Sequence, residues 1–118
     1  FDHHQSHEEF IRMVMIENIH HGAYLDRSEA IRELNARAID HIAEIYSRGV
    51  AEGVFREGLD PLELHWQVSA LCFFNVSNRA TFSKIFGRDL AAEGNLETLR
   101  GNIVDMVLRF VTRNEKLD

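Results

Sequence analysis

The sequence predicts an all-α domain in which the last two long helices form a four-helix bundle with those of a second copy across a two-fold axis. A chain of 118 residues suits one domain and is too short for two ordinary ones. Hydrophobic residues make up 45% and charged residues 27%, while glycine (7) and proline (1) are too scarce for a turn-rich β fold. Apolar residues recur at helical spacing, and no alternating strand pattern competes with them.

Charge and cysteine content narrow the classes of function. The 13 basic and 19 acidic residues give a net charge of -6, which opposes nucleic-acid binding because phosphate contacts need Lys and Arg. A single cysteine forms no internal disulfide and no cysteine-based zinc site, so we expect a reducing, cytoplasmic location. No signal peptide is recognisable, and no apolar run approaches the ~20 residues that cross a membrane.

The first predicted helix covers residues 6–21. Ser6 followed by Glu9 is a capping-box pattern, and Gly22 suits the position after the helix end. The segment is apolar on nearly all sides, which predicts a buried helix, and Glu17 places a carboxylate within that surface.

The second predicted helix runs from Ser28 to about Gly49. It has one apolar face, and its other face carries Glu and Arg at spacings of three and four, as in a solvated helix. Three glycines within residues 49–58 then predict a connection built of turns.

The third and fourth predicted helices cover residues 61–86 and 95–113. Asp60 is a strong N-cap, Pro61 suits the first helical position, and Gly87 suits the stop. The third helix has two apolar faces, and the fourth, capped by Asn95, is apolar over about half of its surface.

The broad apolar surface of these two helices predicts a homodimer. A domain of this size covers one face of each with its own first two helices, so a second copy is expected to cover the rest. The alternative is a compact monomer that packs all of this surface internally.

A second set of residues has the composition of a small-molecule pocket, because aromatic and Met walls with a few polar groups are typical of ligand cavities. The same residues could instead fill a core, and the two faces of the third helix could exchange their roles. The predicted ligand-binding residues are Met13, Ile16, Glu17, His20, Tyr46, Trp66, Ser69 and Phe73.

Metal binding is the alternative from another class of function. Glu17 and His20 form a Glu-x-x-His pattern on one side of a helix, as in carboxylate-bridged metal sites. Such a site normally needs a second copy of this pattern, so a His pair that benefits from the helix end is the simpler interpretation. We therefore predict neither a metal nor another cofactor.

Catalytic motifs are not recognisable. Cys72 lies between Leu71 and Phe73 on a predicted buried helix, where a thiol is inert. The sequence has no glycine-rich phosphate loop and no nucleophile elbow, so we predict that the chain is not an enzyme.

The segment G-V-A-E-G-V-F-R-E-G-L-D-P-L-E-L, followed by a long apolar helix ending F-S-K-I-F-G-R-D-L, resembles the C-terminal effector-binding and dimerisation domain of TetR-family transcriptional regulators. The opening H-E-E-F-I-R-M-V-M-I-E-N and the closing N-I-V-D-M-V-L-R-F-V are similar to that domain's first and last long helices. The resemblance covers nearly all of residues 1–118.

The resemblance implies a homodimer with an effector cavity in each protomer, whose occupancy controls DNA binding. The residues that it implies for the interface between the protomers are Leu64, Val68, Leu71, Asn75, Asn78, Phe82, Leu99, Ile103, Met106 and Phe110. It also implies an N-terminal helix-turn-helix that residues 1–118 lack. The chain opens with Phe1 and not with Met, so we expect a piece of a longer regulator that contacts DNA only through that missing domain.

Overall fold

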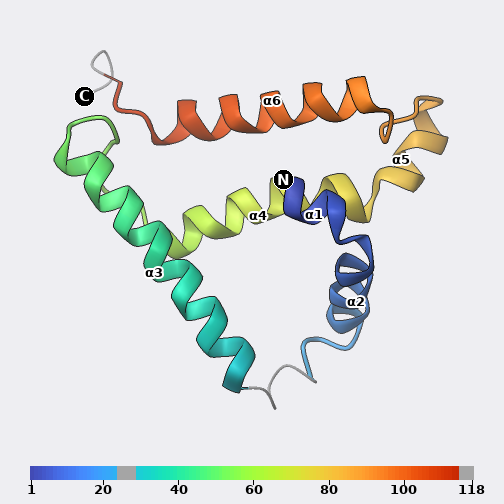
Figure 1. Cartoon of the computed structure of the whole chain (residues 1–118), viewed down its shortest axis with the longest axis horizontal. Coiled ribbons are helices and arrows are strands. Elements are labelled where there is room, and N and C mark those ends of the chain that lie inside the picture. Colours follow the sequence, from blue (N-terminus) through green and yellow to red (C-terminus); the bar gives the residue numbers. More distant parts are fainter. Residues whose placement is uncertain (24–28, 115–118) are drawn as a thin grey trace.

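The structure, a computed structural model, describes residues 1–23 and 29–114, and within them the regular secondary structure is entirely helical (Figure 1). The all-α prediction is confirmed. The only β-type pairing in these residues is an isolated antiparallel bridge between Phe55 and Thr112. The helices are α1 (Asp2–Ser6), α2 (Glu8–Ile19), α3 (Glu29–Ala51), α4 (Pro61–Ser77), α5 (Arg79–Phe86) and α6 (Glu93–Val111).

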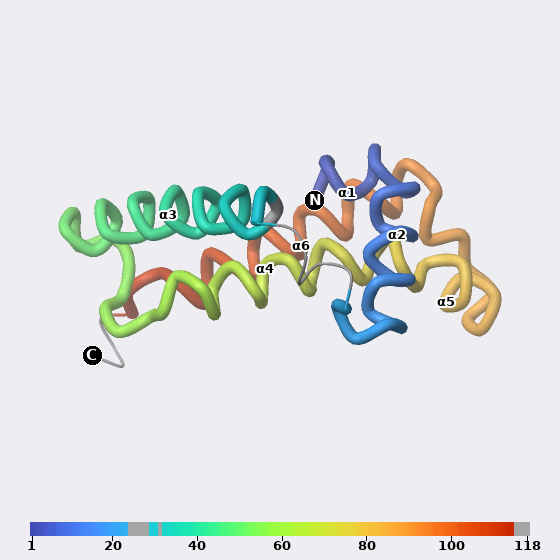
Figure 2. Tube along the Cα trace, turned by 90° about the horizontal axis from the view of Figure 1, so that it is seen from below, coloured from blue at the N-terminus to red at the C-terminus, as the bar shows by residue number. Residues whose placement is uncertain are grey.

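Helix α4 is the centre of the domain (Figure 1). Helices α2 and α3 lie at the two ends of α4 and incline toward each other on the side away from α6 (Figure 1). Helix α6 runs beside α4, and α5 connects them (Figures 1 and 2). The result is a flat molecule with extents of 42 × 40 × 21 Å. Its radius of gyration is 16.7 Å, against about 13.5 Å for a compact domain of this length.

The buried core is small for 118 residues. Its members come from every long helix, and among the described residues they are Ile11, Tyr46, Cys72, Val76, Ile103 and Val111. The accessible surface is 9199 Å², whereas a folded monomer of 13.6 kDa exposes about 6,600 Å². The isolated chain therefore leaves roughly 2,600 Å² more surface uncovered than a self-contained domain of its mass.

The first predicted helix is two helices, which corrects the capping-box prediction. Ser6 is the last residue of α1, and its hydroxyl donates to the Asp2 carbonyl at 3.0 Å instead of capping the next helix. His7 is the N-cap of α2 and makes no side-chain capping bond. The helix ends at Ile19, two residues before the predicted end at His21, and the left-handed backbone begins at His21 with a φ of 57° and continues at Gly22 with a φ of 74°.

Helix α3 continues past Gly49 to Ala51, so this glycine is not the stop that the sequence predicts. A Cβ at Gly49 would lie 2.0 Å from the Phe55 ring, and the glycine therefore permits a close contact between α3 and the following loop. The predicted start at Ser28 lies outside the described residues. Gly53 and Gly58 have positive φ and form the predicted turns.

The third predicted helix is divided at Asn78 into α4 and α5. At its start the prediction is confirmed, since the Asp60 carboxylate accepts a hydrogen bond from the Leu62 amide at 2.9 Å. Asn78 leaves helical geometry, with a φ of -113° and a ψ of 1°, and its side-chain oxygen accepts a hydrogen bond from the Ser77 hydroxyl. Gly87 ends α5 with a φ of 63°, as predicted.

The last helix is shorter than the sequence predicts at its end and longer at its start. It begins at Glu93 with Ala92 as N-cap, and Asn95 does not cap it. It ends at Val111 because the chain beyond it becomes extended and pairs with residues 54–56. The Arg113 amide donates to the Val54 carbonyl at 2.9 Å in this pairing.

Candidate ligand-binding site

A groove of about 350 Å³ lies between α2 and α4. Its volume is within the range of roughly 300–1,000 Å³ that small-molecule sites occupy. Helix α2 contributes two residues one turn apart, and α4 contributes six at spacings of three and four. The lining residues are Val14, Asn18, Leu62, His65, Trp66, Ser69, Ala70 and Phe73.

The chemistry of the groove is apolar with a short polar row. Trp66 is 72% exposed, which is unusual for the largest apolar side chain and leaves its indole face available to a ligand. His65 and Ser69 lie one turn apart on α4, with 3.5 Å between Nε2 and Oγ. Asn18 adds an amide from α2, and none of the described residues that line the groove is an Asp, Glu, Lys or Arg. The groove therefore suits an uncharged, partly aromatic molecule with hydrogen-bonding groups.

The structure brings together three of the residues that the sequence predicts for ligand binding. Trp66, Ser69 and Phe73 line this groove from α4. Sequence reasoning missed His65 and Ala70, although both continue the same spacing of three and four along the helix. The signal was present, but a histidine beside a tryptophan was not recognised as part of the stripe.

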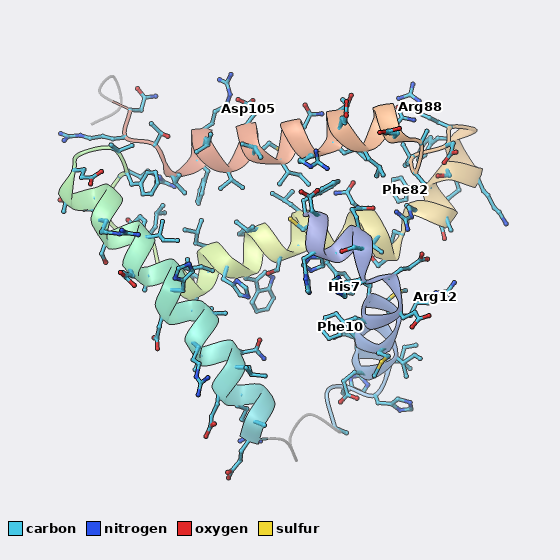
Figure 3. The ribbon with its side chains drawn as sticks, in the orientation of Figure 1. His7, Phe10, Arg12, Phe82, Arg88 and Asp105 are labelled. Carbon is cyan, nitrogen blue, oxygen red and sulfur yellow. The ribbon has the colours of Figure 1, made fainter. Side chains whose placement is uncertain are left out.

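The four predicted residues on α2 do not line the groove, because α2 turns Val14 and Asn18 toward α4 instead. Met13 and Ile16 are 67% and 56% exposed. Glu17 is half-buried and His20 is exposed. Phe10, also on α2, points toward the space between α2 and α3, whereas Arg12 points away from it (Figure 3).

Tyr46 is buried and lies away from the groove. Its hydroxyl donates to the Arg56 carbonyl and accepts from the Leu59 amide at 3.0 Å. Through these two hydrogen bonds, the Tyr46 side chain holds the loop between α3 and α4 against α3. It also lines a different cavity, between α3, α4 and α6.

The segment at the N-terminus is attached to the wall of the groove. The His4 ring packs edge-on against Phe73, with 6.2 Å between ring centroids. Gln5 and Glu8 both contact Arg79 at the start of α5, at 2.7 Å and 3.3 Å. Arg100 of α6 pairs with Asp2 at 2.7 Å. Helix α1 therefore bridges α4, α5 and α6 directly behind the groove.

The ten residues predicted for the dimer interface are divided between the core and the surface. Ile103 is buried. Those that are half-buried are Leu64, Val68, Leu71, Asn75, Asn78 and Leu99. Those that are exposed are Phe82, Met106 and Phe110. Phe82 forms a row with Phe74 and Phe86, with ring centroids 5.3 and 5.4 Å apart, on the surface of α4 and α5.

The metal-site alternative gains no support from the geometry. Within residues 1–23 and 29–114, no three His, Cys, Asp or Glu side chains come together as metal ligands. Cys72 is buried in the core of α4, as the sequence predicts. In the same part of the chain, no helix is both long and apolar enough to cross a bilayer.

Comparison with known proteins agrees with this architecture. The family described as "Tetracyclin repressor-like, C-terminal domain" matches residues 1–107. The HTH-type transcriptional repressor NicS of Pseudomonas putida is 30% identical over 113 residues, which are 96% of this chain and 53% of that protein. The chain thus spans about half the length of the curated relative it matches.

Proposed function

Since this chain belongs to the tetracyclin repressor-like C-terminal domain family of transcriptional regulators, we propose that it is the effector-binding and dimerisation domain of such a regulator. In this proposal a small molecule in the groove between α2 and α4 controls DNA binding by a domain outside these residues. The regulator then acts in the cytoplasm, where its operator lies. The observation that carries the proposal is the exposed Trp66 beside the polar row of His65 and Ser69.

Effector binding at this groove would change the position of the N-terminal segment. A ligand in the groove would contact Phe73, and the His4 ring packs edge-on against the same side chain. Helix α1 is held to α5 by the bond between Gln5 and Arg79, and to α6 by the pair of Asp2 with Arg100. Movement of the groove wall is therefore passed to the first residues of the chain, and a ligand with different affinities for two positions of α1 shifts their populations.

Dimerisation is supported by the uncovered surface. The excess of roughly 2,600 Å² exceeds the ~800 Å² that each partner buries in a standard interface. Exposed apolar side chains gather on α5 and α6, among them Ile85, Phe86 and Val104 at 66%, 69% and 51% exposure. A partner placed on this surface would form the bundle that the sequence predicts.

The test uses Trp66 as its own reporter, because it is the only tryptophan of the 118 residues. Uncharged aromatic and heteroaromatic compounds are titrated while the Trp66 fluorescence is recorded. A saturable change supports the site. An operator-binding assay on the full-length regulator then asks whether the same compound changes DNA affinity. A compound that alters DNA binding without altering Trp66 fluorescence would contradict this groove as the effector site.

A pair of variants on α4 locates the site. Ala70→Phe fills the groove and is expected to weaken effector binding by roughly tenfold or more in calorimetry. Gln67→Phe, also on α4, is the matched control, because Gln67 is exposed and does not line the groove. Equal affinities in the two variants would count against the proposal.

A further inference from the structure

A second cavity lies on the opposite side of α4 from the groove. It has a volume of about 220 Å³, is open to solvent on one side, and is lined by residues of α3, α4, α6 and the loop after α3. Aliphatic side chains such as Ile42, Leu64 and Val107 form most of its wall, together with the rings of Phe55 and Tyr46. His65 lines both this cavity and the groove.

The walls of this cavity are held apart by backbone hydrogen bonds and one tight packing contact. The Arg56 amide donates to the Val111 carbonyl at 2.9 Å, which ties the loop to the end of α6. The Phe55 ring rests on Gly49 of α3, where no side chain fits. The Tyr46 hydroxyl fastens the same loop to α3 through Arg56 and Leu59. The space therefore does not close by a simple side-chain rotation.

The chemistry of the lining selects an uncharged occupant. Among the described residues that line the cavity, only His65 and Tyr46 have polar side chains, and both hydrogen bonds of the Tyr46 hydroxyl are made within the protein. A charged occupant would find no charged partner in this lining, so an uncharged one is favoured.

We propose that this cavity is a second ligand site, separate from the effector groove, for an uncharged single-ring aromatic molecule whose one polar group reaches His65. The entrance lies at Ile45 and Leu108, which are 42% and 50% exposed. Because His65 lines both spaces, an occupant of this cavity also contacts a wall residue of the groove.

The experiment is a methyl NMR titration of the chain with phenol, toluene and benzoate. Phenol and toluene are expected to shift the methyl signals of Val107 and Leu108 at lower concentration than those of Val14 and Leu62. Phenol is expected to bind about threefold more tightly than toluene, because only phenol bonds to His65. His65→Leu should remove that preference. Benzoate should bind at least roughly tenfold more weakly than phenol.

Filling the cavity provides the second measurement. Val68→Phe and Val107→Phe enter it from two different helices, so one remains informative if the other fails to fold. Each is expected to weaken phenol binding by roughly tenfold or more, whereas Ala70→Phe on the groove side should leave it unchanged. Shifts confined to Val14 and Leu62, wild-type phenol affinity in both filled variants, or benzoate binding as tightly as phenol would overturn the proposal.

Discussion

His4 and Phe73 join the first helix of the chain to the wall of the ligand groove, with their rings edge-on and their centroids 6.2 Å apart. Phe73 lines the groove, and His4 contacts the same ring. The residues are 69 positions apart in sequence, so this contact exists only in the folded chain. It gives α1 a direct physical connection to whatever occupies the groove.

His4 should make stability depend on pH. Its burial lowers the pKa of its imidazole below the ordinary value of 6.5, and the positive charges of the N-terminal ammonium and His3 lower it further. The unfolded chain therefore binds a proton near pH 6.5 while the folded chain binds it only at lower pH, so acidification through 6.5 favours unfolding.

We expect the free energy of unfolding to fall as the pH is lowered from about 7.5 to 5.5. In His4→Phe it should fall less, because phenylalanine keeps an aromatic ring at this position but does not titrate. Urea denaturation at the two pH values measures both proteins. An identical loss in the two would exclude His4 as the cause.

Arg79 should stabilise the domain more than Arg100 does. The Arg79 side chain is 17% exposed and bonds to both Gln5 and Glu8. In the other pair, the Arg100 side chain is 46% exposed and that of Asp2 is 72% exposed. Arg79→Ala is expected to cost about 1–2 kcal/mol, because it leaves polar groups without partners at a half-buried site. Arg100→Ala is expected to cost about 0–1 kcal/mol, as exposed ion pairs do. Thermal and urea unfolding of the two variants give the comparison, and the reverse order would refute it.

Phe82 is predicted to lie in the dimer interface. Phe82→Asp places a carboxylate in the aromatic row with Phe74 and Phe86, and an unpaired charge buried between helices opposes association. Sedimentation velocity at tens of micromolar is expected to show a dimer for the wild type and a single chain for the variant. Lys84→Asp, on the same helix, is the control for introducing an acidic residue and should remain dimeric. A fully dimeric Phe82→Asp would place the interface elsewhere.

Two helical glycines should respond in opposite directions to alanine. At Gly49 a methyl group would lie 2.0 Å from the Phe55 ring, so Gly49→Ala forces the loop to move and should destabilise the fold by about 1–3 kcal/mol. At Gly101, in the middle of α6, the new methyl meets nothing within 4 Å. Gly101→Ala should stabilise the helix by about 0.5–1 kcal/mol. Urea denaturation of both variants tests the pair, and stabilisation by Gly49→Ala would show that the contact with Phe55 is absent.

The sequence alone determined the features that depend on local physics. Helical spacing established the all-α class, and Asp60 with Pro61 established the start of α4 because capping involves only neighbouring residues. Gly87 established the end of α5 for the same reason. Trp66, Ser69 and Phe73 lie on one face of α4, as the helical spacing predicted, and their role in ligand binding stays a prediction.

Tertiary structure decided what depends on distant segments. The rotation of α2 about its axis, which turns Val14 toward the groove and leaves Met13 exposed, follows from packing against α4. Tyr46 is buried because the loop after α3 brings the Arg56 carbonyl and the Leu59 amide to its hydroxyl, which forms a hydrogen bond with each. The end of α6 follows from backbone pairing with residues 54–56. A period of 3.6 residues defines the faces of a helix, but only the neighbouring helices determine which face each one covers.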